Sequence, residues 1–336
     1  MGMKLKFDIE NMGNIDKASV TIKPLTIIAG ENSSGKTFVT KGLYTILDSV
    51  YRSSISKEPF ERLLDIGLKK NFQITNLNSL TRQNQNSNLK LSLESLVQID
   101  IDKNQTIEIT LNRETIKDIE NIIFFDSPVY IKVRKALEKN HSYISDEDKY
   151  LKGYPQYLDK LYDYIDKEYI DIADFDAISK DIQEIINGKL EVTQRGDINY
   201  KDNANNTIPL SLTAMGISNI GLIDLLLRNN IINKGSFLIM DEPEVHLHPK
   251  WQVFLAQILY KIAKGGANII IATHSLDFLK AFENILKEEE AVAEDIIAIN
   301  KMPYDESFND LSELEKVGLV LDDLSKPYYD LYMQSI

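Results

Sequence analysis

The feature that most constrains this chain is the run GENSSGKT at residues 30–37. It follows an apolar stretch, Leu25 to Ala29, and it precedes residues 37–54, whose apolar positions recur at helical spacing. A G-x-x-x-x-G-K-[ST] run in this setting forms a loop between a buried strand and a helix. The sequence therefore predicts an α/β fold with this loop at the end of one strand.

The composition of the loop suits an anionic phosphate. Glycines let the backbone wrap around phosphate groups, so that amides and the helix N-terminus face the anion. Lys36 is predicted to neutralise the β- and γ-phosphates of ATP, and the hydroxyl of Thr37 is predicted to ligate Mg²⁺. The loop residues predicted to bind the nucleotide are Gly30, Asn32, Ser33, Ser34, Gly35, Lys36 and Thr37.

A second signal is the run FLIMDEPE at residues 237–244. Four apolar residues predict a buried strand, and two carboxylates follow at its C-terminal end, where open α/β sheets place their ligands. Asp241 is predicted to hold Mg²⁺, and Glu242 to polarise the water that attacks the γ-phosphate. An acid pair after a strand is also common on solvated loops. The phosphate loop in the same chain favours a role for this pair in magnesium binding and hydrolysis.

The third signal is the run IIIATHS at residues 269–275, with its histidine 32 residues after Glu242. A histidine directly after a buried strand is able to reach a γ-phosphate. A lone histidine is more often structural. Its place one strand beyond the acid pair favours a catalytic role for His274.

The order of these motifs resembles the ABC-type ATPase heads of the SMC, RecF and OLD-like proteins, and most of all the compact bacterial AAA ATPases of that group. The stretches that carry the resemblance are LTIIAGENSSGKT, DEPEVHLHPKWQ and IIIATHSLDFL. It covers residues 1–134 and 190–285. The resemblance implies a P-loop ABC-type ATPase head with an antiparallel β-lobe and an inserted helical lobe.

The pattern along the chain predicts four parts. Residues 1–134 are predicted as the N-terminal ATPase lobe, with the β-lobe and phosphate loop. Residues 135–189 are predicted as the inserted helical lobe, and 190–285 as the C-terminal ATPase lobe. Residues 286–336 are predicted as a helical, acidic tail.

Two further sites follow from the resemblance. Gly216 occupies the position of the signature-motif glycine, which caps the γ-phosphate bound by a partner subunit, but Ala214 stands where the family has a serine. The missing hydroxyl predicts slow hydrolysis, unless Thr213 or Ser211 takes its place. Gln73, in the segment NFQI, is the candidate for the glutamine that contacts the nucleotide and metal.

The resemblance also implies a mechanism. Two heads are expected to form a homodimer with two ATP molecules between them, each site combining the loop and carboxylates of one subunit with the Gly216 segment of the other. ATP binding would close the dimer and hydrolysis would reopen it.

Composition limits the location and partners of the chain. Its 336 residues contain no cysteine, which excludes disulfides and thiol catalysis and favours a cytoplasmic location. Its apolar runs are too short to span a membrane. The net charge of −13 arises mainly in residues 208–336, which hold 10 basic and 19 acidic residues. An acidic chain is poorly suited to nucleic-acid binding over its whole surface, although a local site for DNA or RNA remains open.

Three functions remain open at this stage. The first is a Mg²⁺-dependent ATPase that regulates or powers a separately encoded effector, as in bacterial anti-phage or toxin-type systems. The second is a RecF-like DNA-repair ATPase. The third is a nucleotide-binding switch or scaffold that does not hydrolyse ATP, which the Ala214 departure favours.

Overall fold

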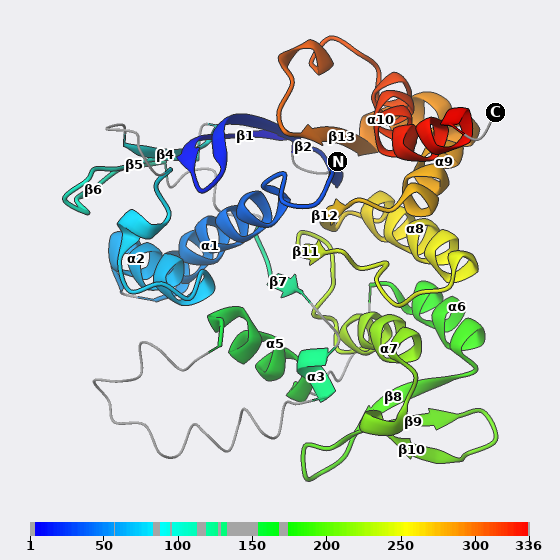
Figure 1. Ribbon diagram of the computed structural model, residues 1–336. Coiled ribbons are helices and arrows are strands. Elements are labelled where there is room, and N and C mark those ends of the chain that lie inside the picture. Colours follow the sequence, from blue (N-terminus) through cyan, green and yellow to red (C-terminus); the bar gives the residue numbers. More distant parts are fainter. Residues whose placement is uncertain are drawn as a thin grey trace.

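Three β-sheets and the helices packed on them make up the computed structural model (Figure 1). The structure describes residues 4–56, 58–82, 88–94, 96–112, 119–126, 129–132, 154–167 and 174–334. Within these ranges, every helix is either too short or too polar to cross a lipid bilayer.

The central sheet has five parallel strands in the order β13-β3-β12-β11-β7. Almost all of its residues are buried, as expected for a parallel sheet covered on both faces. Because the strands are parallel, their C-terminal ends meet at one edge, where such sheets bind ligands. The strands are β3 (Leu25–Gly30), β7 (Ile122–Phe125), β11 (Phe237–Asp241), β12 (Asn268–Thr273) and β13 (Ile297–Met302).

An antiparallel sheet of five strands, in the order β2-β1-β4-β5-β6, forms the β-lobe. In β1 the side chains of Phe7 and Ile9 are buried and that of Lys6 is exposed, the alternation expected of a sheet with one solvated face. The strands are β1 (Leu5–Met12), β2 (Ile15–Ile22), β4 (Leu89–Leu93), β5 (Val97–Ile101) and β6 (Ile107–Leu111).

A small antiparallel sheet lies at the other end of the molecule from the β-lobe (Figure 1). It consists of β8 (Gly188–Val192), β9 (Ile198–Asp202) and β10 (Thr207–Pro209), and it leads directly into helix α7.

Helices cover both faces of the central sheet. Helix α1 packs against β7, β11 and β12, while α8, α9 and α10 lie on the other side of the strands (Figure 1). The helices are α1 (Lys36–Ile55), α2 (Phe60–Asn71), α3 (Val129–Lys132), α5 (Gln156–Asp166), α6 (Asp176–Ile186), α7 (Met215–Arg228), α8 (Pro249–Lys264), α9 (Leu276–Ile296) and α10 (Glu313–Gln334). Short 3₁₀ turns span Leu77–Ser79, Leu210–Leu212 and Glu306–Phe308.

The segment 286–336 differs from the all-helical tail that the sequence predicts. Its residues 297–302 form β13, which pairs with β3 and places Met302 opposite Gly30. An unpaired β3 edge would leave backbone amides and carbonyls without partners inside the fold, and β13 supplies those partners. Strand β13 therefore lies directly beside the start of the phosphate loop.

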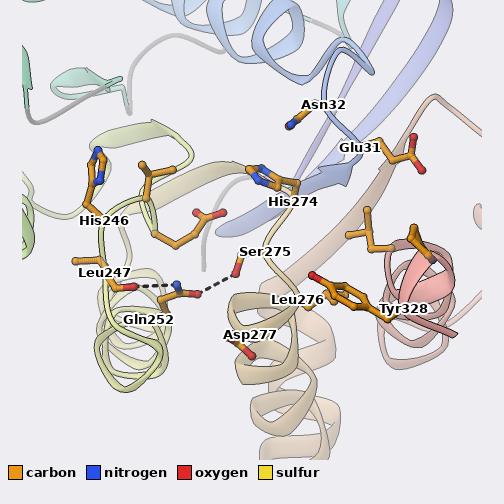
Figure 2. Close-up of a pocket in the computed structure, with 14 residues that line it drawn as sticks. Glu31, Asn32, His246, Leu247, Gln252, His274, Ser275, Leu276, Asp277 and Tyr328 are labelled. Carbon is orange, nitrogen blue, oxygen red and sulfur yellow. Dashed lines mark hydrogen bonds between the residues drawn. The ribbon is translucent and has the colours of Figure 1, made fainter. Parts of the chain in front are cut away.

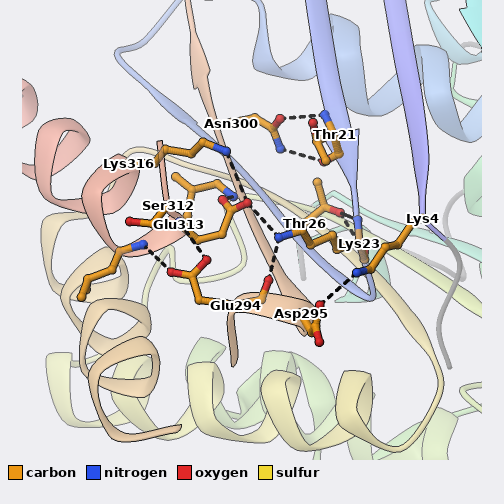
Figure 3. A network of polar contacts seen from close by, with 12 residues as sticks. Lys4, Thr21, Lys23, Thr26, Glu294, Asp295, Asn300, Ser312, Glu313 and Lys316 are labelled. Atoms are coloured by element: carbon orange, nitrogen blue, oxygen red, sulfur yellow. Dashed lines mark hydrogen bonds and ion pairs between the residues drawn. The ribbon is translucent and has the colours of Figure 1, made fainter. Parts of the chain in front are cut away.

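Hydrogen bonds from polar side chains hold β13 and α10 against the β-lobe (Figure 3). The Asn300 amide accepts from the backbone N–H of Thr21 at 2.8 Å and donates to its carbonyl at 3.0 Å. The buried carboxylate of Glu313 on α10 accepts from Lys23 Nζ at 2.9 Å and from the backbone N–H of Ile299 at 2.7 Å. These bonds join the β-lobe, β13 and α10.

The segment 135–189, predicted as an inserted helical lobe, is described in part. Residues 154–167 and 174–189 contain α5, α6 and the beginning of β8. Residues 135–153 and 168–173 lie outside the described ranges. The predicted fold class, an α/β head with an antiparallel β-lobe beside the sheet that carries the phosphate loop, is confirmed.

Candidate functional site

The phosphate loop leaves the C-terminal end of β3 and enters α1 at Lys36. Gly35 adopts a left-handed conformation (φ 102°), and a Cβ there would lie 2.7 Å from the side chain of Ile15, so only glycine fits. No side chain caps the first turn of α1, so its amide groups are available to an anion.

Lys36 lies inside this loop and is only 5% exposed. Its Nζ donates to the carbonyls of Gly30 at 2.9 Å and Glu31 at 2.8 Å. Burial lowers the pKa of Lys36, while three nearby carboxylates, led by that of Glu242, act in the opposite direction. A cation held among carboxylates at the mouth of a loop is well placed to meet an incoming phosphate.

The loop also holds a buried hydroxyl, Ser34 Oγ, that makes no hydrogen bond within the described part of the chain. A buried polar atom without a partner is costly in a folded protein. A bound phosphate oxygen would satisfy it. Together with Lys36 and the amides at the start of α1, this hydroxyl shows that the residues present fit a nucleotide phosphate.

Thr37 and Asp241 come together across the edge of the sheet. Thr37 Oγ1 donates to Asp241 Oδ2 at 2.8 Å. Burial raises the pKa of Asp241 to about 6; the Thr37 hydrogen bond lowers it, and the nearby Asp126 carboxylate raises it. A hydroxyl and a carboxylate side by side beside a phosphate loop are oxygen ligands of the kind that Mg²⁺ prefers, so the donor set fits this ion.

Glu242 and His274 form the second contact of the site. His274 Nδ1 lies 2.8 Å from Glu242 Oε1, a separation at which the two share a hydrogen bond. Glu242 adopts a left-handed backbone conformation (φ 50°), which is uncommon for a residue other than glycine and is found often at functional sites. This conformation of Glu242 changes the direction of the chain directly after β11.

Glu244 is a buried acid that lies outside the predicted site residues. Its Oε1 accepts a hydrogen bond from Thr273 Oγ1, while Oε2 has no partner among the described residues. Burial raises the pKa of Glu244. The signal was present in the sequence, since Glu244 follows the acid pair within the same run.

A cavity of about 820 Å³ opens beside these residues (Figure 2). Asn32 from the phosphate loop, His274 after β12 and Tyr328 of α10 all line it. The cavity thus connects the phosphate loop with the C-terminal helix.

The chain matches the model of the family described as "AAA domain, putative AbiEii toxin, Type IV TA system" over residues 25–280. The match contains the phosphate loop, the acid pair and His274. The chain belongs to this family.

Two curated proteins are similar to parts of this AAA-family chain. The DNA double-strand break repair Rad50 ATPase of Saccharolobus solfataricus is 27% identical over 144 residues, which are 39% of this chain and 17% of that protein. A putative ABC transporter ATP-binding protein of Methanosarcina acetivorans is 32% identical over 83 residues, 25% of this chain and 29% of that protein. The matched regions span less than a third of either relative. The predicted resemblance to ABC-type P-loop ATPases of the SMC and RecF group is confirmed.

Solved structures with a similar arrangement include two Smc heads. The head from Pyrococcus furiosus, bound to the C-terminal domain of ScpA, is 14% identical with a TM-score of 0.49, covering 84% of this chain and 92% of that chain. The head from Thermotoga maritima is 13% identical with a TM-score of 0.46. The match covers 83% of this chain and 92% of that chain.

Gly216, expected in the family's signature segment, lies in the first turn of α7. A Cβ at this position would lie 3.2 Å from the ring of Trp251 and 3.3 Å from Leu247. Thr213, a candidate to replace the missing serine hydroxyl, is buried and donates to the carbonyl of Pro209 at 3.1 Å. Ser211, the other candidate, is exposed. The role of Gly216 stays a prediction, because it concerns a second subunit.

Gln73 lies at the end of α2, where its exposed side chain donates to the carbonyl of Lys70 at 2.6 Å. None of the hydrogen bonds described for Gln73 connects it with the site, and its assignment stays a prediction. A different polar residue, Asp126, emerges beside Asp241. The sequence pattern could have indicated it, because Asp126 follows four apolar residues just as Asp241 does.

Proposed function

We propose that this chain binds ATP with Mg²⁺ and hydrolyses it, and that the cycle of binding and hydrolysis controls a partner. One observation carries the proposal. The phosphate loop, the Thr37–Asp241 contact and the Glu242–His274 contact all lie at the same edge of the parallel sheet. Membership of the AAA family supports an ATPase.

Each residue of the site has a role in this proposal. Lys36 and the amides of the loop bind the β- and γ-phosphates, with Ser34 as a further donor. Thr37 and Asp241 hold the magnesium ion, which supplies positive charge next to the phosphates. Glu242 orients the attacking water and accepts its proton, and His274 fixes the position of Glu242.

The uncapped N-terminus of α7 supports a homodimer in which each copy completes the site of the other. Ala214 precedes α7 as its N-cap residue, and its side chain cannot cap the free amides of the first turn. The N-terminus of α7 in a second copy would supply these amides to the γ-phosphate, as the resemblance implies. ATP then holds two copies together until it is hydrolysed.

Light scattering tests the dimer directly. The variant Glu242→Gln keeps the size of the side chain and one acceptor oxygen, but its amide replaces the second oxygen with an NH₂ donor and cannot accept a proton. With ATP and Mg²⁺ it should double in mass to about 77 kDa, from 38.4 kDa for the single chain. With ADP it should remain at the lower mass. The matched control Lys36→Ala/Glu242→Gln should stay monomeric in ATP, and a monomeric single variant in ATP would contradict the proposal.

Two kinds of partner fit this cycle. The family description supports an ATPase subunit of a toxin or defence system acting on a separately encoded effector in the cytoplasm. The partial match to a DNA-repair ATPase supports DNA as the ligand instead. Hydrolysis measured with duplex DNA, single-stranded DNA and RNA separates these functions, because only a nucleic-acid ligand should accelerate it.

The start of α7 favours one second candidate function, a nucleotide-binding switch that does not hydrolyse ATP. Ala214 lacks the hydroxyl that the family places at this position, and Thr213 directs its own hydroxyl to Pro209. A chain that binds ATP and dimerises with no measurable hydrolysis, with or without nucleic acid, would support this candidate.

A further inference from the structure

A carboxylate outside the predicted motifs lies next to the metal-binding pair. Strand β7 pairs in parallel with β11, with Phe125 opposite Met240. The next residues along the two strands are Asp126 and Asp241, so both leave the sheet at the same edge.

Tyr157 of helix α5 holds Asp126 in place. Its hydroxyl donates to Asp126 Oδ2 at 2.6 Å. The tyrosine is 1% exposed, and burial raises its pKa, so the hydroxyl stays protonated and remains a donor. Its ring packs against Phe124, with centroids 4.5 Å apart, and against Tyr44 of α1 at 6.0 Å. The side chain therefore has little freedom to move.

Further contacts fix the position of α5 itself. Lys160, on the same helix, forms a hydrogen-bonded ion pair with Asp48 of α1. Lys41 Nζ lies 5.6 Å from the centre of the Tyr157 ring, and its charge also acts on Asp241. Helix α1 begins at the phosphate loop, so these contacts join α5 to both sides of the candidate metal site.

We infer that Asp126 is a positioning residue for the magnesium ion, and that Tyr157 holds it in place. In this role Asp126 accepts hydrogen bonds from water bound to the ion, while Thr37 and Asp241 supply the direct ligands. An ionised carboxylate has about four lone-pair sites, so one hydrogen bond from Tyr157 leaves capacity for such water. The inference rests on the proposed function.

The test measures how ATP binding depends on magnesium. Titration calorimetry with ATP, repeated over a range of MgCl₂ concentrations and in excess EDTA, gives the Mg²⁺ concentration at which half of the gain in affinity is reached. The full chain is compared with Tyr157→Phe and Asp126→Asn. Tyr162→Phe is the matched control, because it removes a buried tyrosine hydroxyl from the same helix, one that donates to the carbonyl of Tyr130.

The inference predicts a specific pattern. Loss of a residue that orients the ligands of a metal site typically lowers metal affinity by 10- to 100-fold. The Mg²⁺ concentration that gives half of the gain in ATP affinity (the half-point) should therefore rise about 10-fold or more in Asp126→Asn. Tyr157→Phe should raise it several-fold and add little to Asp126→Asn in the double variant. Affinity in EDTA should be unchanged, and Tyr162→Phe should match the wild type.

Other results would overturn the inference. If Tyr157→Phe and Tyr162→Phe behave alike, or if affinity in EDTA falls as much as affinity in Mg²⁺, the Tyr157 contact is structural only. If Asp126→Asn leaves the half-point unchanged while the wild type depends on Mg²⁺, the inference alone fails. If the wild type binds no ATP under any condition, the proposed function fails with it.

Discussion

His274 Nδ1 lies 2.8 Å from Glu242 Oε1, although the two residues are 32 positions apart in the sequence. The pairing of β11 with β12 accounts for this contact. Asp241 lies opposite Ala272, and the backbone N–H of Glu242 donates to the Ala272 carbonyl at 2.9 Å. The sheet register therefore brings the predicted water-positioning acid to the predicted histidine before any nucleotide arrives.

Replacing Glu242 by glutamine should separate binding from hydrolysis. The amide preserves the shape of the side chain but accepts no proton, so the rate should fall by about 100-fold or more. Affinity for ATP should change little, because Lys36 and the loop remain. Single-turnover hydrolysis and ATP titration measure the two quantities. A variant with the wild-type rate would show that another group positions the water.

The half-buried carboxylate of Asp241 should destabilise the protein in the absence of ligands. Its pKa is raised from 3.8 in the unfolded chain to about 6 in the fold, so the folded state binds the proton more tightly. Ionisation thus lowers the free energy of unfolding as pH rises from about 4 to about 6, and the penalty is complete above that range. Asp241→Asn should therefore raise the free energy of unfolding at pH 7.5 by about 1–3 kcal/mol.

The same substitution should have a much smaller effect near pH 4, where Asp241 is protonated in the folded state. Urea unfolding of the wild type and of Asp241→Asn, at pH 7.5 and near pH 4, measures the change in the free energy of unfolding under each condition. An equal gain at both would mean that the charge of Asp241 is not what destabilises the fold.

Any side chain at Gly30 should destabilise the fold, because strand β13 packs directly against this residue. A Cβ there would lie 2.0 Å from the carbonyl oxygen of Met302. Gly30→Ala should lower the free energy of unfolding by about 1–3 kcal/mol, the usual cost of overpacking. Gly318→Ala in α10 is the control: its Cβ would meet no heavy atom within 4 Å, and it should stabilise the helix by about 0.5–1 kcal/mol.

The sequence predicts those parts of the site that lie in short runs. The phosphate loop, Asp241, Glu242 and His274 each follow a buried apolar strand, and a residue directly after such a strand must lie at the binding edge of a parallel sheet. The helical periodicity of residues 37–54 locates α1.

Features that depend on pairing between distant segments were not predicted. Strand β13 joins β3 across about 270 residues, and nothing in IAINKM alone indicates which edge it completes. Asp126 follows an apolar run as Asp241 does, but only the pairing of β7 with β11 and the packing of Tyr157 from α5 place it beside Asp241. The prediction for Gln73 rests on its spacing from Lys36. That spacing does not indicate where α2 ends, and therefore does not indicate where the side chain of Gln73 lies.

The measurement that tests the central claim most directly is ATP hydrolysis by the purified chain in Mg²⁺, compared with Lys36→Ala. Removing the ammonium group takes away the charge that meets the β- and γ-phosphates, so the account predicts steady release of phosphate by the wild type and none above background by the variant. Equal rates for the two proteins would contradict the account, since hydrolysis would then not depend on the phosphate loop.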